Sequence, residues 1–157
     1  MGMKRQKIRK KEKKVIFQKL KEETGIELKG ELERIEINGR IVYLLDNEPI
    51  ILEYDGRYYL TVYGVMKFKP AKGRVVVDEG ALKFVINGAD VMKPGIVEAD
   101  NEIKEGDFCY VVVEKKLTPL AVGIALVSGK EMTGGKGKAV KNIHHINDKI
   151  WKFFFKK

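Results

Sequence analysis

Few residues in this chain of 157 could do chemistry. Ser128 is the only serine, and it lies outside the Gly-x-Ser-x-Gly turn that exposes a nucleophilic serine. His144 and His145 are adjacent in a predicted strand, so they point to opposite faces and do not share one metal ion. Cys109 is the single cysteine, which excludes an intrachain disulfide and a cysteine-rich zinc site. We therefore expect no enzymatic activity, no metal and no cofactor.

A glycine- and lysine-rich stretch, "TGGKGKAVKN" (133–142), is a second candidate for chemistry. It lacks the Gly-Lys-Ser/Thr end of a phosphate-binding loop, and it leads into a predicted strand rather than a helix N-terminus that could hold phosphate. A flexible basic loop that contacts a nucleic-acid backbone fits it better. Asp90 and Asp148 each lie beside a turn, and we expect both carboxylates to make local backbone hydrogen bonds.

Positive charge is concentrated at the two ends of the chain. The net charge is +9 at pH 7, and residues 1–14 carry +7 while residues 129–157 carry +6, so the middle is slightly acidic. Basic ends favour binding to a polyanion such as nucleic acid over a purely solubilising role. No apolar run reaches the roughly 18 residues that a membrane helix needs. We expect a cytoplasmic protein with no membrane partner.

The first half of the chain predicts a small α+β unit. Apolar residues at helical spacing predict a helix over residues 8–24. Two hairpins follow, with Asn38-Gly39 between "LERIEI" and "RIVYLL" and Asp55-Gly56 between "PIILEY" and "RYYLTVY" (57–63). Each dipeptide supplies the two positive φ values of a type I′ turn. The segment "KFKPAKGR" (67–74) marks a domain boundary.

The second half predicts a barrel of short strands. It opens with the strand "RVVVD" (74–78), where Asp78 is the expected N-cap of a short helix that ends at Gly88. Three further strands are predicted: "FCYVVVEK" (108–115), "LAVGIALVS" (120–128) and "VKNIHHINDKIWKFFF" (140–155). Many short strands with one short helix favour a small barrel over a parallel sheet. The predicted fold class is α+β and β-rich, with two small domains that pack together.

The exit from the short helix, "NGADVMKPG" (87–95), combines special backbone positions with small and apolar residues. Gly88 and Ala89 leave space for sugar and phosphate to approach, since glycine also permits unusual dihedral angles. Two alternatives are open for this exit. Either Gly88 is only a helix cap and Val91 and Met92 belong to the core, or the glycine shapes a binding surface and the apolar pair stacks against a splayed base.

The stretch "VVVDEGALKFVINGADVMKPGIVEAD" resembles the opening of the PUA domain, named after pseudouridine synthases and archaeosine transglycosylases. "GDFCYVVV", "LAVGIALVSGKEM" and "GKAVKNIHHINDKIW" follow in that family's order, so the likeness covers about residues 74–153. The whole chain resembles the subgroup in which a pre-PUA domain precedes the PUA domain, the family of the malignant T-cell-amplified protein. Residues 1–73 match mainly through their layout. The implied organisation is a basic arm (1–14), a pre-PUA α+β domain (15–72) and a PUA pseudobarrel (73–157).

The resemblance implies an RNA-binding face made by the first PUA helix, the loop after it, the next strand and the last strand. Carried onto this sequence, the face contains Lys83, Asn87, Gly88, Ala89, Asp90, Val91, Met92 and Lys93, with Lys136, Lys138 and Lys141 beside it. Lysines on such a face set the affinity through phosphate, and the loop shapes what fits.

The function that the resemblance implies is non-catalytic RNA binding in translation, at the small ribosomal subunit or the acceptor end of tRNA. The eukaryotic relatives work with a separate partner protein, so a translation-factor partner is also expected. One alternative is an accessory subunit that brings RNA to a tRNA or rRNA modification enzyme. Another is a scaffold whose PUA fold binds protein.

Overall fold

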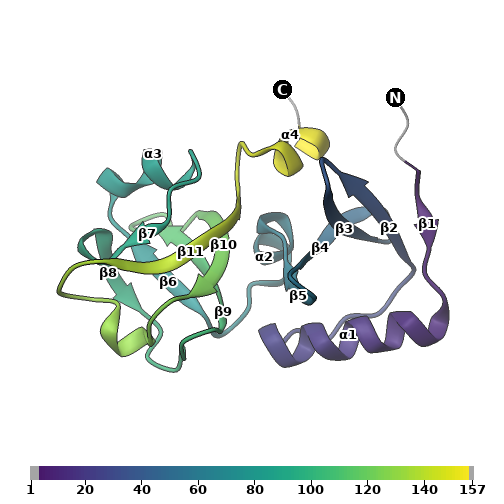
Figure 1. Cartoon of the computed structure of the whole chain (residues 1–157), viewed down its shortest axis with the longest axis horizontal. Helices are drawn as coiled ribbons and strands as arrows, with labels where there is room; N and C mark the ends of the chain where they lie inside the picture. The colour runs from purple at the N-terminus through teal and green to yellow at the C-terminus, as the bar shows by residue number, and fades with distance from the viewer. Residues whose placement is uncertain (1–3, 156–157) are drawn as a thin grey trace.

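The computed structural model describes residues 4–155 and contains two sheets that lie side by side (Figure 1). The first sheet is antiparallel, with its five strands in the order β1-β2-β3-β4-β5. Its elements are β1 (Gln6–Lys7), α1 (Lys10–Thr24), β2 (Leu32–Ile37), β3 (Arg40–Leu45), β4 (Glu48–Tyr54), β5 (Arg57–Leu60) and α2 (Val62–Phe68). Within residues 4–155, no helix combines the length and the hydropathy that crossing a membrane requires.

The two predicted hairpin turns are confirmed. Asn38 and Gly39 have φ values of 50° and 78°, and Asp55 and Gly56 have φ values of 52° and 77°. Both residues of each turn are therefore left-handed, as a type I′ turn requires. Because these turns set the strand register locally, the sequence alone was enough to predict them.

The segment "RYYLTVY", predicted as one strand, is a strand only as far as Leu60, and α2 begins two residues later. Thr61 makes this change: its Oγ1 accepts the N–H of Gly64 at 2.9 Å and donates to the carbonyl of Pro49 at 2.6 Å. A Cβ at Gly64 would lie 2.7 Å from the carbonyl oxygen of Ile50, so the helix packs directly on the sheet backbone. Capping and close packing therefore override the strand propensity of Val and Tyr.

The second sheet curls into a nearly closed pseudobarrel, and the predicted fold class is confirmed (Figure 1). Its strand order is β7-β11-β10-β9-β6-β8, in which only the β6–β9 pair is parallel. Its elements are β6 (Arg74–Val77), η1 (Glu79–Ala81), α3 (Leu82–Val85), β7 (Val91–Met92), η2 (Lys93–Gly95), β8 (Ile96–Ala99), β9 (Phe108–Val113), β10 (Pro119–Ala125), η3 (Gly129–Glu131), β11 (Lys138–His145) and α4 (Lys149–Phe155). The predicted cap at Asp78 is confirmed, since its carboxylate accepts the N–H of Ala81 at 2.9 Å.

The prediction of one strand over residues 140–155 is wrong in its second half. The chain leaves β11 after His145 and forms α4 from Lys149. Asn147 has φ 72°, which breaks the extended backbone, and Asp148 accepts the N–H of Trp151 at 2.8 Å. The aromatic run that suggested a strand therefore sits on a capped helix.

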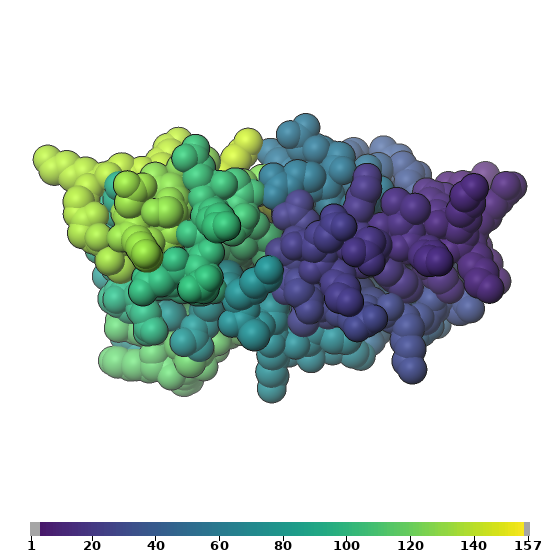
Figure 2. All heavy atoms as spheres, turned by 90° about the horizontal axis from the view of Figure 1, so that it is seen from below, coloured from purple at the N-terminus to yellow at the C-terminus, as the bar shows by residue number. Residues whose placement is uncertain are grey.

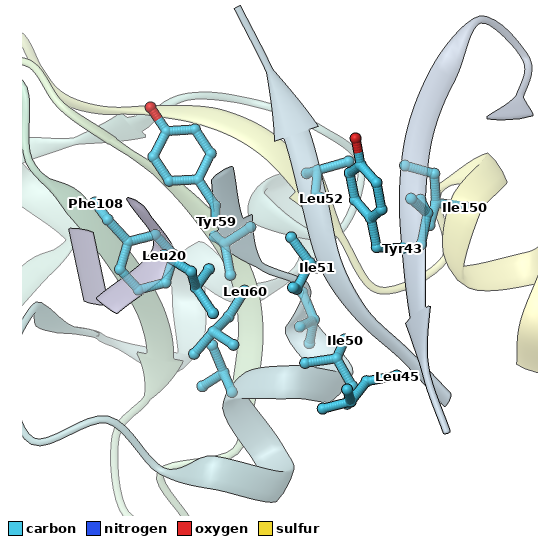
Figure 3. Close-up of a cluster of buried hydrophobic side chains, with 14 of the residues drawn as sticks. Leu20, Tyr43, Leu45, Ile50, Ile51, Leu52, Tyr59, Leu60, Phe108 and Ile150 are labelled. Carbon is cyan, nitrogen blue, oxygen red and sulfur yellow. The ribbon is translucent and has the colours of Figure 1, made fainter. Parts of the chain in front are cut away.

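A shared apolar core joins the two sheets. The ring of Phe108 from β9 stacks on Tyr59 from β5, with centroids 5.8 Å apart and planes 17° apart. Ile150 from α4 is buried in the same cluster, near Tyr43 and Leu52 of the first sheet (Figure 3). An apolar interface of this kind resists relative motion. The pseudobarrel is thus held in one orientation against the first sheet.

Residues 6–14, predicted as part of a basic arm, lie within the first folded unit. Strand β1 pairs with β2, and the side chain of Ile8 is buried while its N–H donates to Leu32 at 2.9 Å. Helix α1 already begins at Lys10. Residues 1–3 of the predicted arm lie outside the described residues. Most of the charge of this segment is consequently fixed on a structured surface.

Candidate nucleic-acid interface

The exit from α3 is the first feature of the site, and we call residues 83–93 the helix-exit corner. Gly88 has φ 97°. Its N–H donates to the carbonyl of Val85, and the N–H of Ala89 donates to the carbonyl of Phe84, both at 3.0 Å. This pair of bonds is a Schellman cap, which needs a left-handed residue at the position of Gly88. The predicted end of the helix is confirmed, and both N–H groups are used inside the protein.

Asp90 and Asn142 fasten the helix-exit corner to β11. The Oδ1 atom of Asp90 accepts the backbone N–H of Asn142 at 3.0 Å, and its Oδ2 atom lies 3.2 Å from the ammonium of Lys138. The side-chain amide of Asn142 donates to the carbonyls of Val85 and Ala89, each at 3.0 Å. The expectation of purely local bonds at Asp90 is wrong, because its partners lie on a distant strand. Sequence reasoning missed Asn142, whose role depends on the pairing of β7 with β11.

The helix-exit corner exposes two large apolar side chains and buries a third. Val91 is 2% exposed and belongs to the barrel core, so a stacking role for Val91 is wrong. Met92 is 45% exposed and Phe84 is 58% exposed. Phe84 was missed, although it lies outside the apolar stripe that the helical spacing of Ala81, Leu82, Val85 and Ile86 predicts for this helix. The Lys83 ammonium lies 5.4 Å from the Phe84 ring centre, and the Asn87 amide donates to the Lys83 carbonyl at 2.8 Å.

Basic residues from β11 and the preceding loop border the helix-exit corner. Lys138 lies opposite Met92 in the register of β7 and β11. The N–H of Lys93 donates to the carbonyl of Gly137 at 2.9 Å, which joins the loop carrying Lys136 to the end of β7. The structure therefore brings these three predicted lysines close to the exit, although Asp90 neutralises one of them.

Lys141 lies apart from the other lysines, at the seam between the two sheets. Its ammonium lies 5.4 Å from the ring centre of Tyr54 in β4, and a hydrogen bond that it donates to the Tyr54 hydroxyl raises the pKa of Lys141. The guanidinium of Arg40 lies 5.6 Å from the same ring. Two cations from different halves of the chain thus flank one aromatic ring.

A hollow of about 350 Å³ separates the helix-exit corner from the first sheet. Its lining comes from both halves of the chain: Ile37, Asn38, Arg40, Gly88, Asn142, Ile143, His145, Asp148, Lys149 and Ile150. Gly88 and Ala89 remain exposed beside it, so the first domain borders the exit without covering it.

Two of the residues that line this hollow carry buried hydrogen-bonding atoms without a partner in the described part of the chain. Arg40 donates its Nη2 to the carbonyl of Ile143 at 2.8 Å, but its Nε and the Oδ1 of Asn142 are buried without a partner among residues 4–155. The Nδ1 of His145 lies 2.8 Å from the carbonyl of Ile146, so Nδ1 carries a proton. A Cβ at Gly88 would lie 3.2 Å from the Nε2 of the same ring. Within residues 4–155, a donor and an acceptor thus lie unpaired just beneath the surface of the hollow.

Comparison with known proteins identifies the domain families and the relatives that the chain resembles. Residues 73–146 match the family model described as PUA domain, and residues 4–68 match the one described as Domain of unknown function (DUF1947). An uncharacterized protein of Methanocaldococcus jannaschii is 48% identical over 145 residues, which is 92% of this chain and 88% of the relative. Translation machinery-associated protein 20 of Schizosaccharomyces pombe is 34% identical over 131 residues, 79% of this chain and 72% of the relative. The crystal structure of a hypothetical protein of Pyrococcus horikoshii OT3 has a TM-score of 0.84 at 40% identity, and the match covers 96% of this chain and 99% of that one.

The chain belongs to the family of PUA-domain proteins that carry a pre-PUA region. The membership predicted from the sequence is thereby confirmed. The helix-exit corner lies within the PUA match, whereas α1 and the first sheet lie within the DUF1947 match. The PUA match ends one residue after β11, so α4 follows it and packs on the pre-PUA sheet.

His144 of this PUA domain is buried and pairs with Asp148. His144 is 1% exposed, and its Nδ1 lies 2.7 Å from the carboxylate of Asp148. Burial alone would raise the pKa of Asp148, but the bonds from His144 and from the N–H groups of Trp151 and His145 hold it below its usual value. Among residues 4–155, no three His, Cys, Asp or Glu side chains form a cluster able to hold a metal. The local bonding expected for Asp148 is confirmed.

Proposed function

We propose that this PUA-domain protein binds RNA at the helix-exit corner and serves translation in the cytoplasm without catalysing a reaction. The match to the PUA domain supports RNA as the ligand, because the resemblance to that domain implies an RNA-binding face. The printed name of the Schizosaccharomyces pombe relative, Translation machinery-associated protein 20, supports the process. The observation that carries the proposal is the Schellman cap at Gly88. It leaves an exposed surface with small side chains next to lysines and to unpaired hydrogen-bonding atoms.

The side chains divide the work of binding. Because the N–H groups of Gly88 and Ala89 are used in the cap, they leave phosphate to the lysines. Phe84 and Met92 offer exposed apolar surface for a base, and the hollow beside Gly88 accepts a base edge. We assign the RNA to the small ribosomal subunit or to the acceptor end of tRNA, with a translation factor as a protein partner.

Variants in which lysines are replaced by uncharged glutamines test this proposal. The corner variant combines Lys83→Gln, Lys93→Gln and Lys136→Gln, none of which removes an ion pair among the described residues. Its matched control combines Lys104→Gln, Lys116→Gln and Lys130→Gln, which remove the same charge from exposed positions elsewhere in the PUA domain.

Both variants are titrated with a labelled tRNA by fluorescence anisotropy and are sedimented with small ribosomal subunits. We expect the corner variant to lose about tenfold or more in affinity at about 0.1 M salt, because several phosphate contacts are lost. The control should stay within about twofold of the wild type. Equal losses in both variants would contradict an RNA site at this corner.

A further inference from the structure

A large hollow in the described part of the chain lies far from the helix-exit corner. It is a groove of about 1060 Å³ between α1, the end of β1 and the loop over residues 25–31. We propose that this groove is a second RNA site, which holds a single-stranded stretch through its phosphates. The inference rests on the proposed function for the ligand class and assigns a binding site to the pre-PUA region.

Cations make up half of the residues that line the groove. Seven Lys or Arg residues and two Glu residues line it: Lys7, Arg9, Lys10, Lys13, Lys14, Lys21 and Lys29, with Glu27 and Glu31. Glu31 pairs with Lys7 and Glu27 pairs with Lys21, each at 3.7 Å. Four exposed cations lack an ion pair among residues 4–155: Arg9, Lys10, Lys14 and Lys29. They flank the groove from the helix on one side and from the loop on the other.

The placement of these cations does not serve the stability of α1. Arg9 occupies its N-cap position without a side-chain cap, and Lys10 opens its first turn. The start of a helix carries partial positive charge, so cations there are unfavourable. A bound anion would relieve this repulsion more fully than solvent and salt do, because it would lie between the cations and the helix start.

The groove is formed before any ligand binds. The ammonium of Lys13 donates to the carbonyl of Gly30 at 2.9 Å, which ties the helix to the loop. The N–H of Glu31 donates to the carboxylate of Asp46 at 2.9 Å. A Cβ at Gly30 would lie 2.5 Å from that carboxylate, so the loop packs tightly against the β3–β4 turn. A fixed wall lowers the entropy that binding must remove.

The floor of the groove favours an RNA strand over an acidic amphipathic helix. Ile8 and Leu28 are only 5% and 7% exposed, and Phe17 is half-buried. A helix in a groove needs a row of large exposed apolar side chains, and among the residues that line this groove only Phe17 supplies one. A single strand carries a charge on every nucleotide and needs cations along both walls, which the groove provides.

The groove and the helix-exit corner lie at opposite ends of the molecule. Figure 1 places α1 in the pre-PUA half and α3 at the far side of the pseudobarrel. The view from below in Figure 2 shows the residues of α1 at the surface of the pre-PUA half. Two sites so placed on one rigid body bind separate stretches of one RNA, and their affinities reinforce each other.

The test uses the full chain and a labelled single-stranded oligoribonucleotide of mixed sequence. The groove variant combines Lys10→Gln, Lys14→Gln and Lys29→Gln, and the control is the triple of Lys104, Lys116 and Lys130 described above. We expect the groove variant to lose about tenfold or more in affinity at low salt. Its slope of log affinity against log salt should fall by about 2, since each phosphate contact to a single strand contributes about 0.7. The control should keep both values.

Lysine footprinting gives a second readout that does not depend on folding of a variant. In the wild type, the oligoribonucleotide should protect Lys10, Lys14 and Lys29 from acetylation, while Lys104 and Lys116 stay reactive. An unchanged slope together with unprotected groove lysines would overturn the inference. Polyglutamate is titrated in parallel as a stand-in for an acidic protein. If the groove variant loses affinity for polyglutamate but keeps its affinity for RNA, the inference is overturned and the groove is assigned to acidic proteins. The corner variant is titrated in the same assay to separate the two proposals. A loss of affinity in the corner variant alone would support only the helix-exit corner, and a loss in the groove variant alone would support only the groove.

Discussion

The backbone N–H of Asn142 donates to the carboxylate of Asp90 over 3.0 Å, across a sequence separation of 52 residues. This bond and the two bonds of the Asn142 amide hold the loop after α3 against the last strand of the barrel. The shape of the helix-exit corner therefore depends on β11 as much as on the helix that precedes it.

Replacing Asn142 with Leu should loosen this corner. The substitution keeps the approximate volume but leaves the carbonyls of Val85 and Ala89 without their side-chain donor, which costs about 1–3 kcal/mol of unfolding free energy. Urea unfolding measures this loss, and Asn101→Leu at an exposed position is the matched control. A variant as stable as the control would show that the amide does not hold the loop.

Replacing Asp90 with Asn should strengthen RNA binding. The amide oxygen can still accept the N–H of Asn142, but the negative charge that pairs with Lys138 at 3.2 Å is gone. With Lys138 free for phosphate, we expect affinity for tRNA to rise by about two- to fivefold at about 0.1 M salt. The gain should vanish when Lys138→Gln is added. If Asp90→Asn alone weakens the complex, Lys138 does not contact phosphate in the way proposed.

Acid should weaken the junction between β11 and α4. The pKa of Asp148 is lower in the folded protein than the unfolded value of about 3.9, so its stabilising contribution is complete above that pH. The contribution is lost as the pH falls through the folded pKa. At pH 7, Asp148→Asn should lower the unfolding free energy by about 1–3 kcal/mol, because the charged acceptor beside the buried His144 is lost, while the amide oxygen can still cap α4. The difference from the wild type should shrink in urea titrations below about pH 4, whereas a difference independent of pH would contradict the role of the charge.

The features that the sequence predicted are those set by neighbouring residues. The type I′ turns at Asn38-Gly39 and Asp55-Gly56 and the cap at Gly88 each depend on a few adjacent residues. The family resemblance added the pseudobarrel and the approximate position of the corner. Thr61 and Asp148 end two predicted strands with helix caps, in stretches whose aromatic and β-branched residues favoured a strand.

The partners that the sequence missed are set by pairing between distant strands. Nothing near Asn142 in the chain indicates that it faces the loop after α3, because that contact follows from the pairing of β7 with β11. Arg40 reaches Ile143 only because the shared core around Phe108 brings the two sheets together. The burial of Val91 likewise follows from its position in the closed barrel rather than from its spacing in the sequence.

The most direct test of RNA binding at the helix-exit corner compares Gly88→Val with Gly106→Val. The two glycines have φ values of 97° and 92°, so valine strains the backbone similarly at each. Only at Gly88 does the new side chain meet a neighbour, His145, and stand on the proposed surface; at Gly106 it meets nothing within 4 Å. Binding of labelled tRNA to each folded variant should be weaker by about tenfold or more for Gly88→Val and within about twofold of the wild type for Gly106→Val. Equal affinities for the two variants would contradict RNA binding at this corner.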